Sequence, residues 1–341
     1  MILGYASLYS PDDCERALPD VAAARRMFAE RESDIPARLA AVAARIGADP
    51  RVLDAVTLAT ARLGMRHGSF GQDFHHYHNE NHIMEIAERR LTRLLDSLGN
   101  GILSPLESSA LLLFAACHDL RQRETYDVAG PVGGNEAASI SETFRLLDRC
   151  DFDRQHDRPM YVALELMIAG STFDASPAPP ADPHGGELAS VAGGALARGL
   201  SLWLDAEVGV WRMDPDARRG ERLGRVAADL DTANVGEDFP LFCESALRLC
   251  KEREMRSGRD LKQASSAPTC LGFLAPGQLH YFFDLHSFCS REGEHVFGPQ
   301  KLANAERLRF SSGALAKRFA RFPASNGAAV ITAFMEINAL E

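Results

Sequence analysis

The 341-residue sequence is poor in lysine and contains no run of basic residues. Its lysines are Lys251, Lys262, Lys301 and Lys317, so nearly all of the 37 basic side chains are guanidinium groups, which can grip a carboxylate or a phosphate through two parallel hydrogen bonds. The 47 acidic residues outnumber the basic ones and give a net charge of −10. Because a general binder of nucleic acid or of an anionic membrane needs surplus positive charge, this balance argues against both activities.

Cysteine pairs and long hydrophobic runs are also missing. The seven cysteines are an odd number and form no C-x-x-C motif, which favours a reducing compartment over a disulfide framework. The longest apolar run, Ala110–Cys117, is far shorter than the roughly 20 residues of a membrane span. Residues 1–10 lack the basic start of a signal peptide. We therefore expect a cytoplasmic protein without a membrane span.

Helical periodicity dominates the sequence, whereas sustained alternation of apolar and polar residues is absent. The Ser104-Pro105 pair and Asn135 are expected N-terminal helix signals. We therefore predict an all-α fold. The expected helices are Ala37–Ile46, Arg51–Leu63, Asn81–Leu98, Pro105–Cys117, Glu136–Leu147, Pro159–Ala169, Leu188–Trp203, Arg218–Leu230, Phe239–Glu254, Pro276–Ser290, Pro299–Phe319 and Ala328–Leu340.

Two stretches interrupt this helical pattern. Gly130–Gly134 is rich in glycine, and Ser171–Gly194 contains four prolines and four glycines. A stretch as long as the second is either a surface insertion without a role or a mobile loop that acts as a lid.

Four of the eleven histidines lie between Phe74 and His82. His78 and His82 are four residues apart, so both would project from one face of a helix that began near Tyr77. That spacing suits two metal ligands, or one ligand and one proton donor. The alternative is a solvated histidine-rich turn, or histidines stacked in the core.

Two further groups of ionisable residues stand near expected helix ends. His118 and Asp119 follow the apolar run directly, and burial of such a pair is costly unless a cation compensates the charge. Asp229 and Asp231 are separated by about 200° around a helix, so only one of them can face a given site. We expect the other to be a solvated or capping carboxylate.

Three ordered motifs, Tyr77-His78-Asn79-x-x-His82, His118-Asp119 and Asp231-x-x-Asn234, together resemble those of the HD-domain metal-dependent phosphohydrolases. The spacing is most similar to cyclic-nucleotide phosphodiesterases and to uncharacterised bacterial HD proteins. The opening Asn135-Glu136-x-x-Ser139 is similar to that of bacterial members.

This resemblance, which extends from about Arg66 to Gly236, implies an HD-domain helical bundle with additional helices at both ends. We expect an N-terminal helical extension over 1–65, the metal-binding core over 66–250, and helices that close the active site over 251–341, all within one continuous domain.

The resemblance also implies roles for individual residues. The metal ligands would be His82, His118, Asp119 and Asp231, with Asp119 bridging to a second ion. The tight site would hold zinc, manganese or iron, and the second would hold magnesium or manganese. His78 would be the general acid, and Glu136 would orient the metal-bound waters. Asn79 and Asn234 would support the site through hydrogen bonds.

Gln278 and Tyr281 have the spacing with which phosphodiesterases bind and stack on a nucleotide base, although aromatic residues there are also typical of a core. Where those enzymes carry a further histidine after the His-Asp pair, this sequence has Gln122 between Arg121 and Arg123. We expect these two arginines to bind a terminal or more anionic phosphate.

The sequence therefore predicts hydrolysis of a small, nucleotide-like phosphodiester or phosphomonoester by attack of a metal-bound hydroxide, with His78 protonating the leaving group. One alternative is a catalytically weak HD-fold module that binds nucleotides for regulation. Another is a di-iron oxygenase on the same fold, for which the remaining histidines have no suitable spacing.

Overall fold

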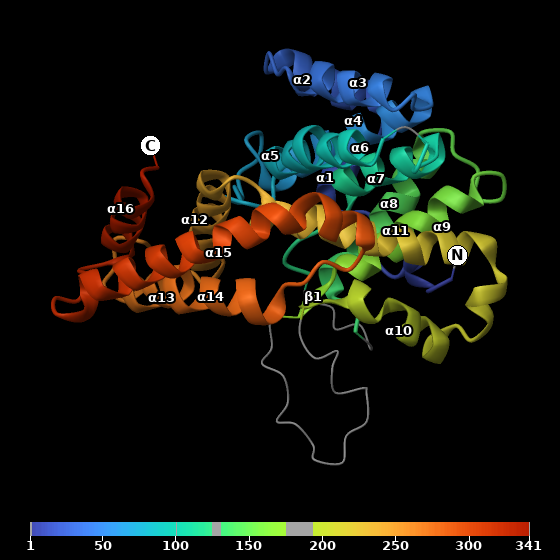
Figure 1. The fold of residues 1–341 in the computed structure, drawn as a ribbon. Helices are drawn as coiled ribbons and strands as arrows, with labels where there is room; N and C mark the ends of the chain where they lie inside the picture. The colour runs from blue at the N-terminus through green and yellow to red at the C-terminus, as the bar shows by residue number, and fades with distance from the viewer. Residues whose placement is uncertain (1, 100, 125–130, 175–193, 341) are drawn as a thin grey trace. The chain divides into compact units, whose positions relative to one another are not determined.

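The computed structural model describes residues 2–99, 101–124, 131–174 and 194–340, which are predominantly helical (Figure 1). The predicted all-α fold is confirmed. The strands among the described residues are β1 (Phe173–Asp174) and β2 (Gly194–Ala195), which pair antiparallel.

The chain divides into two compact units, each described separately below. Unit 1 comprises Met1–Phe74, His78–Asp231 and Phe288–Val296. Unit 2 comprises His75–Tyr77, Thr232–Ser287 and Phe297–Glu341. Residues 1–65 thus share a unit with most of the predicted core, while Thr232–Ser287 belongs to unit 2. The predicted domain boundaries at 65/66 and 250/251 stay predictions. That the C-terminal helices close the active site stays a prediction.

Unit 1 is built almost entirely from short and medium-length helices. They are η1 (Tyr5–Ser7), α1 (Asp13–Ala17), α2 (Val21–Glu30), α3 (Ile35–Arg45), α4 (Pro50–His67), α5 (Glu80–Met84), η2 (Glu85–Leu91), α6 (Thr92–Leu98), α7 (Pro105–Cys117), α8 (Gly134–Arg149), α9 (Arg158–Ser171), η4 (Leu196–Gly199), α10 (Leu200–Glu207), η5 (Val210–Met213) and α11 (Pro215–Thr232).

Helix α7 forms the centre of unit 1. Every residue from Ser108 to Cys117 is buried, as expected of a helix that is apolar on all sides. It packs against α4, α8 and α9 (Figure 1). The predicted start of α7 is confirmed, because Ser104 and Glu107 form a reciprocal capping box before this apolar run. The end of α7 therefore brings His118 and Asp119 out of the most buried part of the unit.

The predicted cap of α8 is wrong. This helix begins one residue before Asn135, and its N-cap is Gly133. The Asn135 side chain instead accepts a hydrogen bond from the Glu124 backbone N–H at 2.9 Å. The difference arises from tertiary structure, because the Asn135 amide hydrogen-bonds to the loop that follows α7 and not to its own helix.

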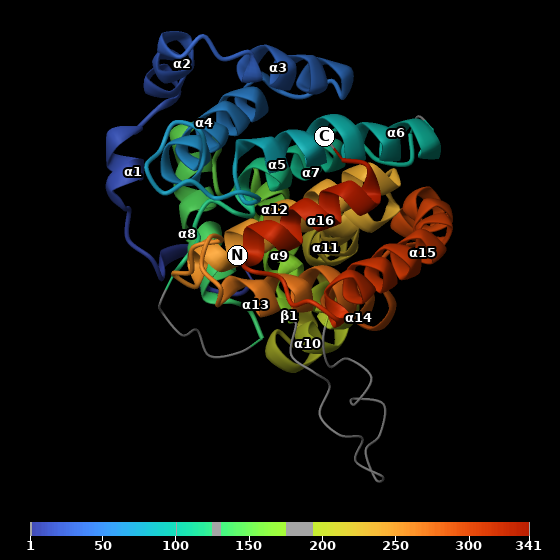
Figure 2. The same cartoon turned by 90° about the vertical axis from the view of Figure 1, so that its left-hand side faces the viewer.

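Unit 2 contains the remaining helices, of which α15 begins in unit 1. They are η6 (Ala233–Gly236), α12 (Phe239–Arg256), α13 (Ser266–Gly272), η7 (Phe273–Gly277), α14 (Gln278–His280), η8 (Tyr281–Leu285), α15 (Arg291–Ala320) and α16 (Gly327–Asn338). Within unit 2, α16 packs along α13 (Figure 2).

Two helix boundaries in this part differ from the predictions. The helix expected from Pro276 to Ser290 starts at Ser266 and ends at Leu285, with Pro276 inside the π-helical segment η7. The helix expected to start at Pro299 starts at Arg291. The Gly293 N–H donates to the Ser290 hydroxyl, so Ser290 caps α15 and Pro299 lies inside the helix.

The predicted insertion at Ser171–Gly194 and the predicted helix at Leu188–Trp203 fall partly outside the described residues. Within the described part, α9 ends at Ser171 and the helical structure before Trp203 begins at Leu196.

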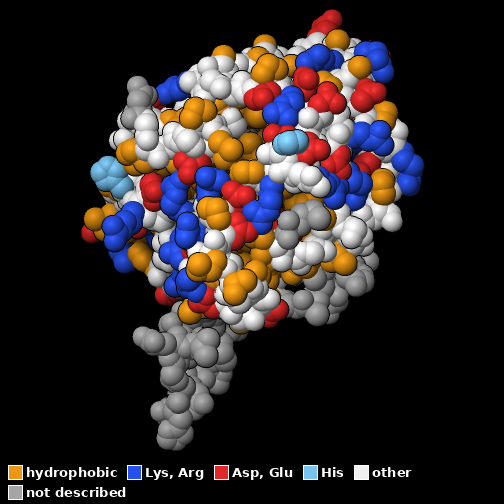
Figure 3. Space-filling model, turned by 90° about the vertical axis from the view of Figure 1, so that its right-hand side faces the viewer, with side chains coloured by type: hydrophobic (Ala, Val, Ile, Leu, Met, Phe, Trp, Pro, Cys, Tyr) orange, Lys and Arg blue, Asp and Glu red, His pale blue; other side chains and the backbone are white. Residues whose placement is uncertain are grey.

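No described helix combines the length and the apolar character needed to cross a membrane. On the face shown in Figure 3, Lys and Arg side chains are interspersed with Asp and Glu.

Candidate metal centre

His82 is the third residue of α5, which begins later than the sequence predicted. Asn79 is the N-cap, and its side chain accepts a hydrogen bond from the Asn81 N–H at 2.9 Å. The expectation that His78 and His82 share one helical face is therefore wrong, because His78 precedes the helix. Its ring is nevertheless 6.1 Å, centroid to centroid, from that of His82.

His118 is oriented by the end of α7. Its Nδ1 is 3.2 Å from the Phe114 carbonyl oxygen, and its ring stacks on that of Phe114 with centroids 4.7 Å apart. Because Nδ1 faces a carbonyl acceptor, this arrangement favours the tautomer in which Nδ1 carries the proton and Nε2 has a lone pair for a ligand.

Asp231 comes from the last turn of α11 and completes a cluster with His82, His118 and Asp119, here called the His/Asp cluster. Its Oδ1 lies 3.0 Å from His82 Nε2 and 3.4 Å from His118 Nε2. Asp119 Oδ2 lies 3.0 Å from His118 Nε2 and 3.9 Å from His82 Nε2. His82 and Asp231 are thus neighbours, although they are 149 positions apart in the sequence.

The donor set fits a transition-metal ion. Ligand atoms of His82, His118 and Asp119 all lie within 4.8 Å of one another. His118 Nε2 and Asp119 Oδ2 are both buried, and neither makes a hydrogen bond with the described residues despite their 3.0 Å separation. Unsatisfied buried atoms of this kind are costly, and a shared cation would satisfy both.

The two carboxylates of the His/Asp cluster favour a positive charge beside them. Burial opposes ionisation, yet the carboxylates of Asp119 and Asp231 raise the pKa of His118 well above its ordinary value. Against the same burial, His118 and His78 lower the pKa of Asp119 to about 2. The pKa of Asp231 is likewise lowered, chiefly by His118. A divalent cation would replace the proton that His118 carries.

The second carboxylate oxygen of Asp119, Oδ1, accepts a hydrogen bond from outside the His/Asp cluster. Gln122 Nε2 donates to Asp119 Oδ1 at 3.0 Å, and Asn135 Nδ2 donates to Gln122 Oε1 at 3.2 Å. The amide of Gln122 is thereby oriented by Asn135, and Oδ2 remains the oxygen that faces the histidines. Gln122 was identified in the sequence only as a departure from the family pattern, and its contact with Asp119 depends on tertiary structure.

His78 and Glu136 are electrostatically coupled to this cluster. The charge of His78 contributes to the lowered pKa of Asp119. Burial raises the pKa of Glu136, and the negative charges of Asp119 and Asp231 add to the rise. Both residues are thus close enough to the proposed ligands to interact with them electrostatically.

Asp229 is not the solvated carboxylate that the sequence allowed. It is buried and accepts hydrogen bonds from the backbone N–H groups of Cys289 and Ser290 at 2.6 and 2.8 Å. Both N–H groups belong to residues that precede α15, where Ser290 is the capping residue, so Asp229 holds this distant segment and is neither solvated nor a helix cap.

Arg121 belongs to a second charged cluster in unit 1, which we call the arginine cluster. Its members are Asp12, Glu15, Arg62, Arg66, Arg121, Glu124, Glu142 and Arg145. Arg121 is 8% exposed and pairs with Glu124 at 2.7 Å. Arg123 is exposed, and its guanidinium lies 3.3 Å from Asp73. Both guanidinium groups thus have carboxylate partners, and the phosphate-binding role predicted for both arginines stays a prediction.

The remaining predicted site residues belong to unit 2. Asn234 lies in η6 and is buried, and its Oδ1 has no hydrogen-bond partner among the described residues. Gln278 in α14 is only 4% exposed. Tyr281 follows three residues later at the start of η8, half-buried and 5.7 Å from the His286 ring. The arrangement of these residues toward the His/Asp cluster stays a prediction.

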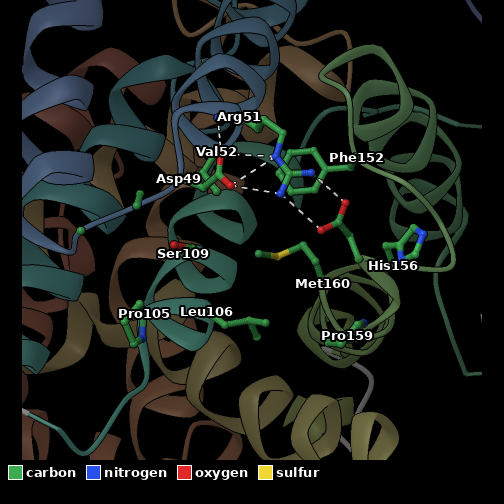
Figure 4. Close-up of a pocket in the computed structure, with 13 residues that line it drawn as sticks. Asp49, Arg51, Val52, Pro105, Leu106, Ser109, Phe152, His156, Pro159 and Met160 are labelled. Atoms are coloured by element: carbon green, nitrogen blue, oxygen red, sulfur yellow. Dashed lines mark hydrogen bonds and ion pairs between the residues drawn. The ribbon is translucent and has the colours of Figure 1, made fainter.

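Unit 1 also contains a pocket of about 370 Å³ near the starts of α4, α7 and α9 (Figure 4). On one wall Arg51 pairs with Asp49 and Asp157 and lies over the Phe152 ring. None of the predicted site residues lines this pocket.

No protein-family model and no curated protein sequence matches the chain. Among solved structures, the phosphodiesterase domain of the RhoPDE fusion protein from the choanoflagellate Salpingoeca rosetta is similar, with a TM-score of 0.52 and 14% identity over 94% of this chain and 97% of that one. A second structure, the phosphodiesterase domain of Salpingoeca rosetta rhodopsin phosphodiesterase, gives a TM-score of 0.49 at 14% identity, covering 93% of this chain and 91% of that one. The first comparison shows that the chain shares the fold of a phosphodiesterase domain.

Proposed function

We propose that this chain is a metal-dependent phosphohydrolase that cleaves a small, nucleotide-like phosphoester. The observation that carries the proposal is the convergence of two imidazoles and two carboxylates from α5, the end of α7 and the end of α11. The shared fold with a phosphodiesterase domain supports the same conclusion. The order of the ligands agrees with the resemblance to HD-domain phosphohydrolases.

His82, His118, Asp119 and Asp231 would hold one ion, and Asp119 is the candidate to contact a second. A bound divalent ion supplies charge neutralisation on the phosphoryl oxygens and lowers the pKa of a water molecule from about 16 to about 7. Zinc, manganese or iron fits the mixed imidazole and carboxylate donors.

His78 is the proposed general acid. It stands outside the helix and close to the ring of His82, where a protonated imidazole can deliver a proton to the leaving oxygen. Glu136, at the start of α8, is the proposed residue that orients water near the ligands. Such proton transfer contributes about 10²–10⁴-fold to the rate.

Gln278 is the proposed base-recognition residue. It is almost completely buried on α14, and an amide offers both a donor and an acceptor for a nucleobase edge. Tyr281 supplies the proposed stacking surface.

The central test measures metal content and hydrolysis together. The purified protein should contain at least one transition-metal ion and should hydrolyse some member of a panel of cyclic mononucleotides, cyclic dinucleotides, nucleoside phosphates and generic phosphoesters. The double variant His118→Ala/Asp119→Ala should lose both the metal and the activity. A double variant that keeps its metal would show that the site is assigned wrongly.

His78→Gln provides the matched control, because it alters the proposed acid without removing a proposed ligand. It should retain the metal and lose about 10²–10⁴-fold in kcat. Retention of metal together with no hydrolysis of any substrate by the wild type would favour a regulatory binding module instead.

A further inference from the structure

Arg90 is fully buried although it carries a permanent charge. It lies in the π-helical segment η2, which continues the helix of His82. Its Nη1 is 3.0 Å from the Leu230 carbonyl oxygen and 2.6 Å from that of Asp231, to which it donates hydrogen bonds. The guanidinium therefore binds the C-terminal end of α11, where the helix dipole favours a cation.

Glu85 connects Arg90 to His82, which lies on the same continuous helix. Arg90 Nη2 is 3.6 Å from Glu85 Oε2, and that same oxygen is 3.7 Å from His82 Nδ1. Residues five apart are adjacent in a π-helix, which explains how Glu85 contacts Arg90 as well as Arg89, its partner at ordinary helical spacing.

These contacts close a ring. It runs from the Asp231 carboxylate to His82 Nε2, through the imidazole to Nδ1, and then through Glu85 and Arg90 back to the Asp231 main-chain carbonyl. The Glu85 carboxylate does not hydrogen-bond to Nδ1 at 3.7 Å, but its negative charge favours a proton on that nitrogen and so leaves Nε2 as the ligand atom. Arg90 balances the charge of that carboxylate and fixes the backbone of the second ligand.

We propose that Arg90 and Glu85 are positioning residues that together set the geometry of His82 and Asp231 for metal binding. This inference rests on the proposed function, because it assumes that these two residues are ligands. Neither Arg90 nor Glu85 is assigned contact with substrate or metal.

The test is Mn²⁺ binding to the full-length chain, measured by titration calorimetry after removal of bound metal. Glu85→Gln and Arg90→Met should each weaken Mn²⁺ binding by about 10–100-fold, the range typical when a residue supporting a metal ligand is lost. Arg90→Lys keeps the charge but not the fork of donors, so its loss should be smaller. The double variant should lose less than the sum of the two single losses, because both substitutions break one ring.

Arg89→Met is the matched control. Arg89 Nη2 lies 3.6 Å from the same Glu85 carboxylate, but its side chain is 39% exposed. This variant should bind Mn²⁺ within about twofold of wild type, as expected for an exposed ion pair. Circular dichroism and urea unfolding of the metal-free proteins identify variants that fail to fold, and Glu85→Gln and Arg90→Lys carry the test if Arg90→Met is one of them.

Two outcomes would contradict the inference in different ways. If the wild type binds Mn²⁺ and folded Glu85→Gln and Arg90→Lys bind it equally well, the positioning role is wrong while the metal centre stands. If the wild type binds neither Mn²⁺ nor Zn²⁺, the proposed function fails and the positioning role fails with it. A kcat that falls with unchanged KM in the variants would further support positioning at the metal rather than at the substrate.

Discussion

Unit 1 contains two buried clusters of carboxylates that differ in what neutralises them. In the arginine cluster, Glu142 lies 3.1 Å from Arg66 and 3.5 Å from Arg62, and Glu15 is bound by both sides of the Arg145 fork. In the His/Asp cluster, the charges that act most strongly on Asp119 and Asp231 are those of histidines. Guanidinium groups are always charged, whereas an imidazole can give up its proton to a metal.

This difference indicates which of the two acidic clusters is the better candidate for a metal site. By proximity alone, Asp12, Glu15 and Glu142 could also hold an ion. Their arginine partners already supply the compensating charge, so an added cation would be repelled. The His/Asp cluster contains buried nitrogen and oxygen atoms without hydrogen bonds, which a cation would satisfy.

The largest expected effect comes from removal of one proposed ligand. Asp231→Asn should reduce metal affinity by at least about 10²-fold and abolish hydrolysis, because a neutral amide replaces an anionic ligand. Metal analysis after dialysis and the hydrolysis assay measure this. The metal-free variant should lose some stability, because the Asp231 carboxylate interacts favourably with His118, and circular dichroism checks that it is folded. An unchanged metal content would show that the His/Asp cluster is not the metal site and does not differ from the arginine cluster in this respect.

A large loss of stability, rather than of metal, is expected when the arginine cluster is broken. Arg66→Met should lower the free energy of unfolding by about 3–5 kcal/mol, because Glu142 would lose its closest cationic partner in a buried position. Urea unfolding of the metal-free protein measures this loss. Arg66 also donates to the Leu120 carbonyl, so a modest loss of metal affinity through Asp119 should accompany it.

The pH dependence of stability should distinguish the clusters further. Burial raises the pKa of Glu142 to about 7 although Arg66 opposes the rise. The folded state therefore keeps Glu142 protonated above pH 4.5, which is about its pKa in the unfolded chain. The stability that the protonated carboxyl contributes is lost as the pH rises through about 7.

Urea unfolding of wild type and Glu142→Gln between pH 5 and 8 checks this prediction. The wild type should lose stability relative to the variant across the range, because glutamine does not titrate. Among the neighbouring members of the arginine cluster, Arg66 lowers the pKa of Asp12 against the effect of burial, so Asp12 titrates below this window. Parallel curves for the two proteins would contradict the assignment.

The smallest predicted effect concerns the helix that leads to the metal centre. Ser104→Ala removes the hydroxyl of the capping box and should cost about 1 kcal/mol of stability. Metal affinity should stay within about twofold, because the cap lies at the opposite end of α7 from His118. A substantial change in metal binding would show that the two ends of this helix are coupled.

The sequence by itself determined the helical class, the capped start of α7 and its apolar course, because spacing and capping act within a few residues. It could name His82, His118, Asp119 and Asp231 as a group only through ordered motifs, and their function stays a prediction. Without those motifs it could not decide between Asp229 and Asp231, since their separation around a helix does not show which of the two faces the histidines.

Only the tertiary structure decided the partners of buried charges. Arg121 pairs with the carboxylates of Asp12 and Glu15, Asp229 binds the residues just before α15, and Arg90 closes a ring with Asp231. Each of these contacts joins positions that local spacing leaves unrelated, or depends on a π-helical turn that no ordinary helix pattern signals. The physical reason is that the partner of a buried charge is selected by what the folded chain brings within a few ångströms, whereas sequence spacing fixes neighbours only along one helix.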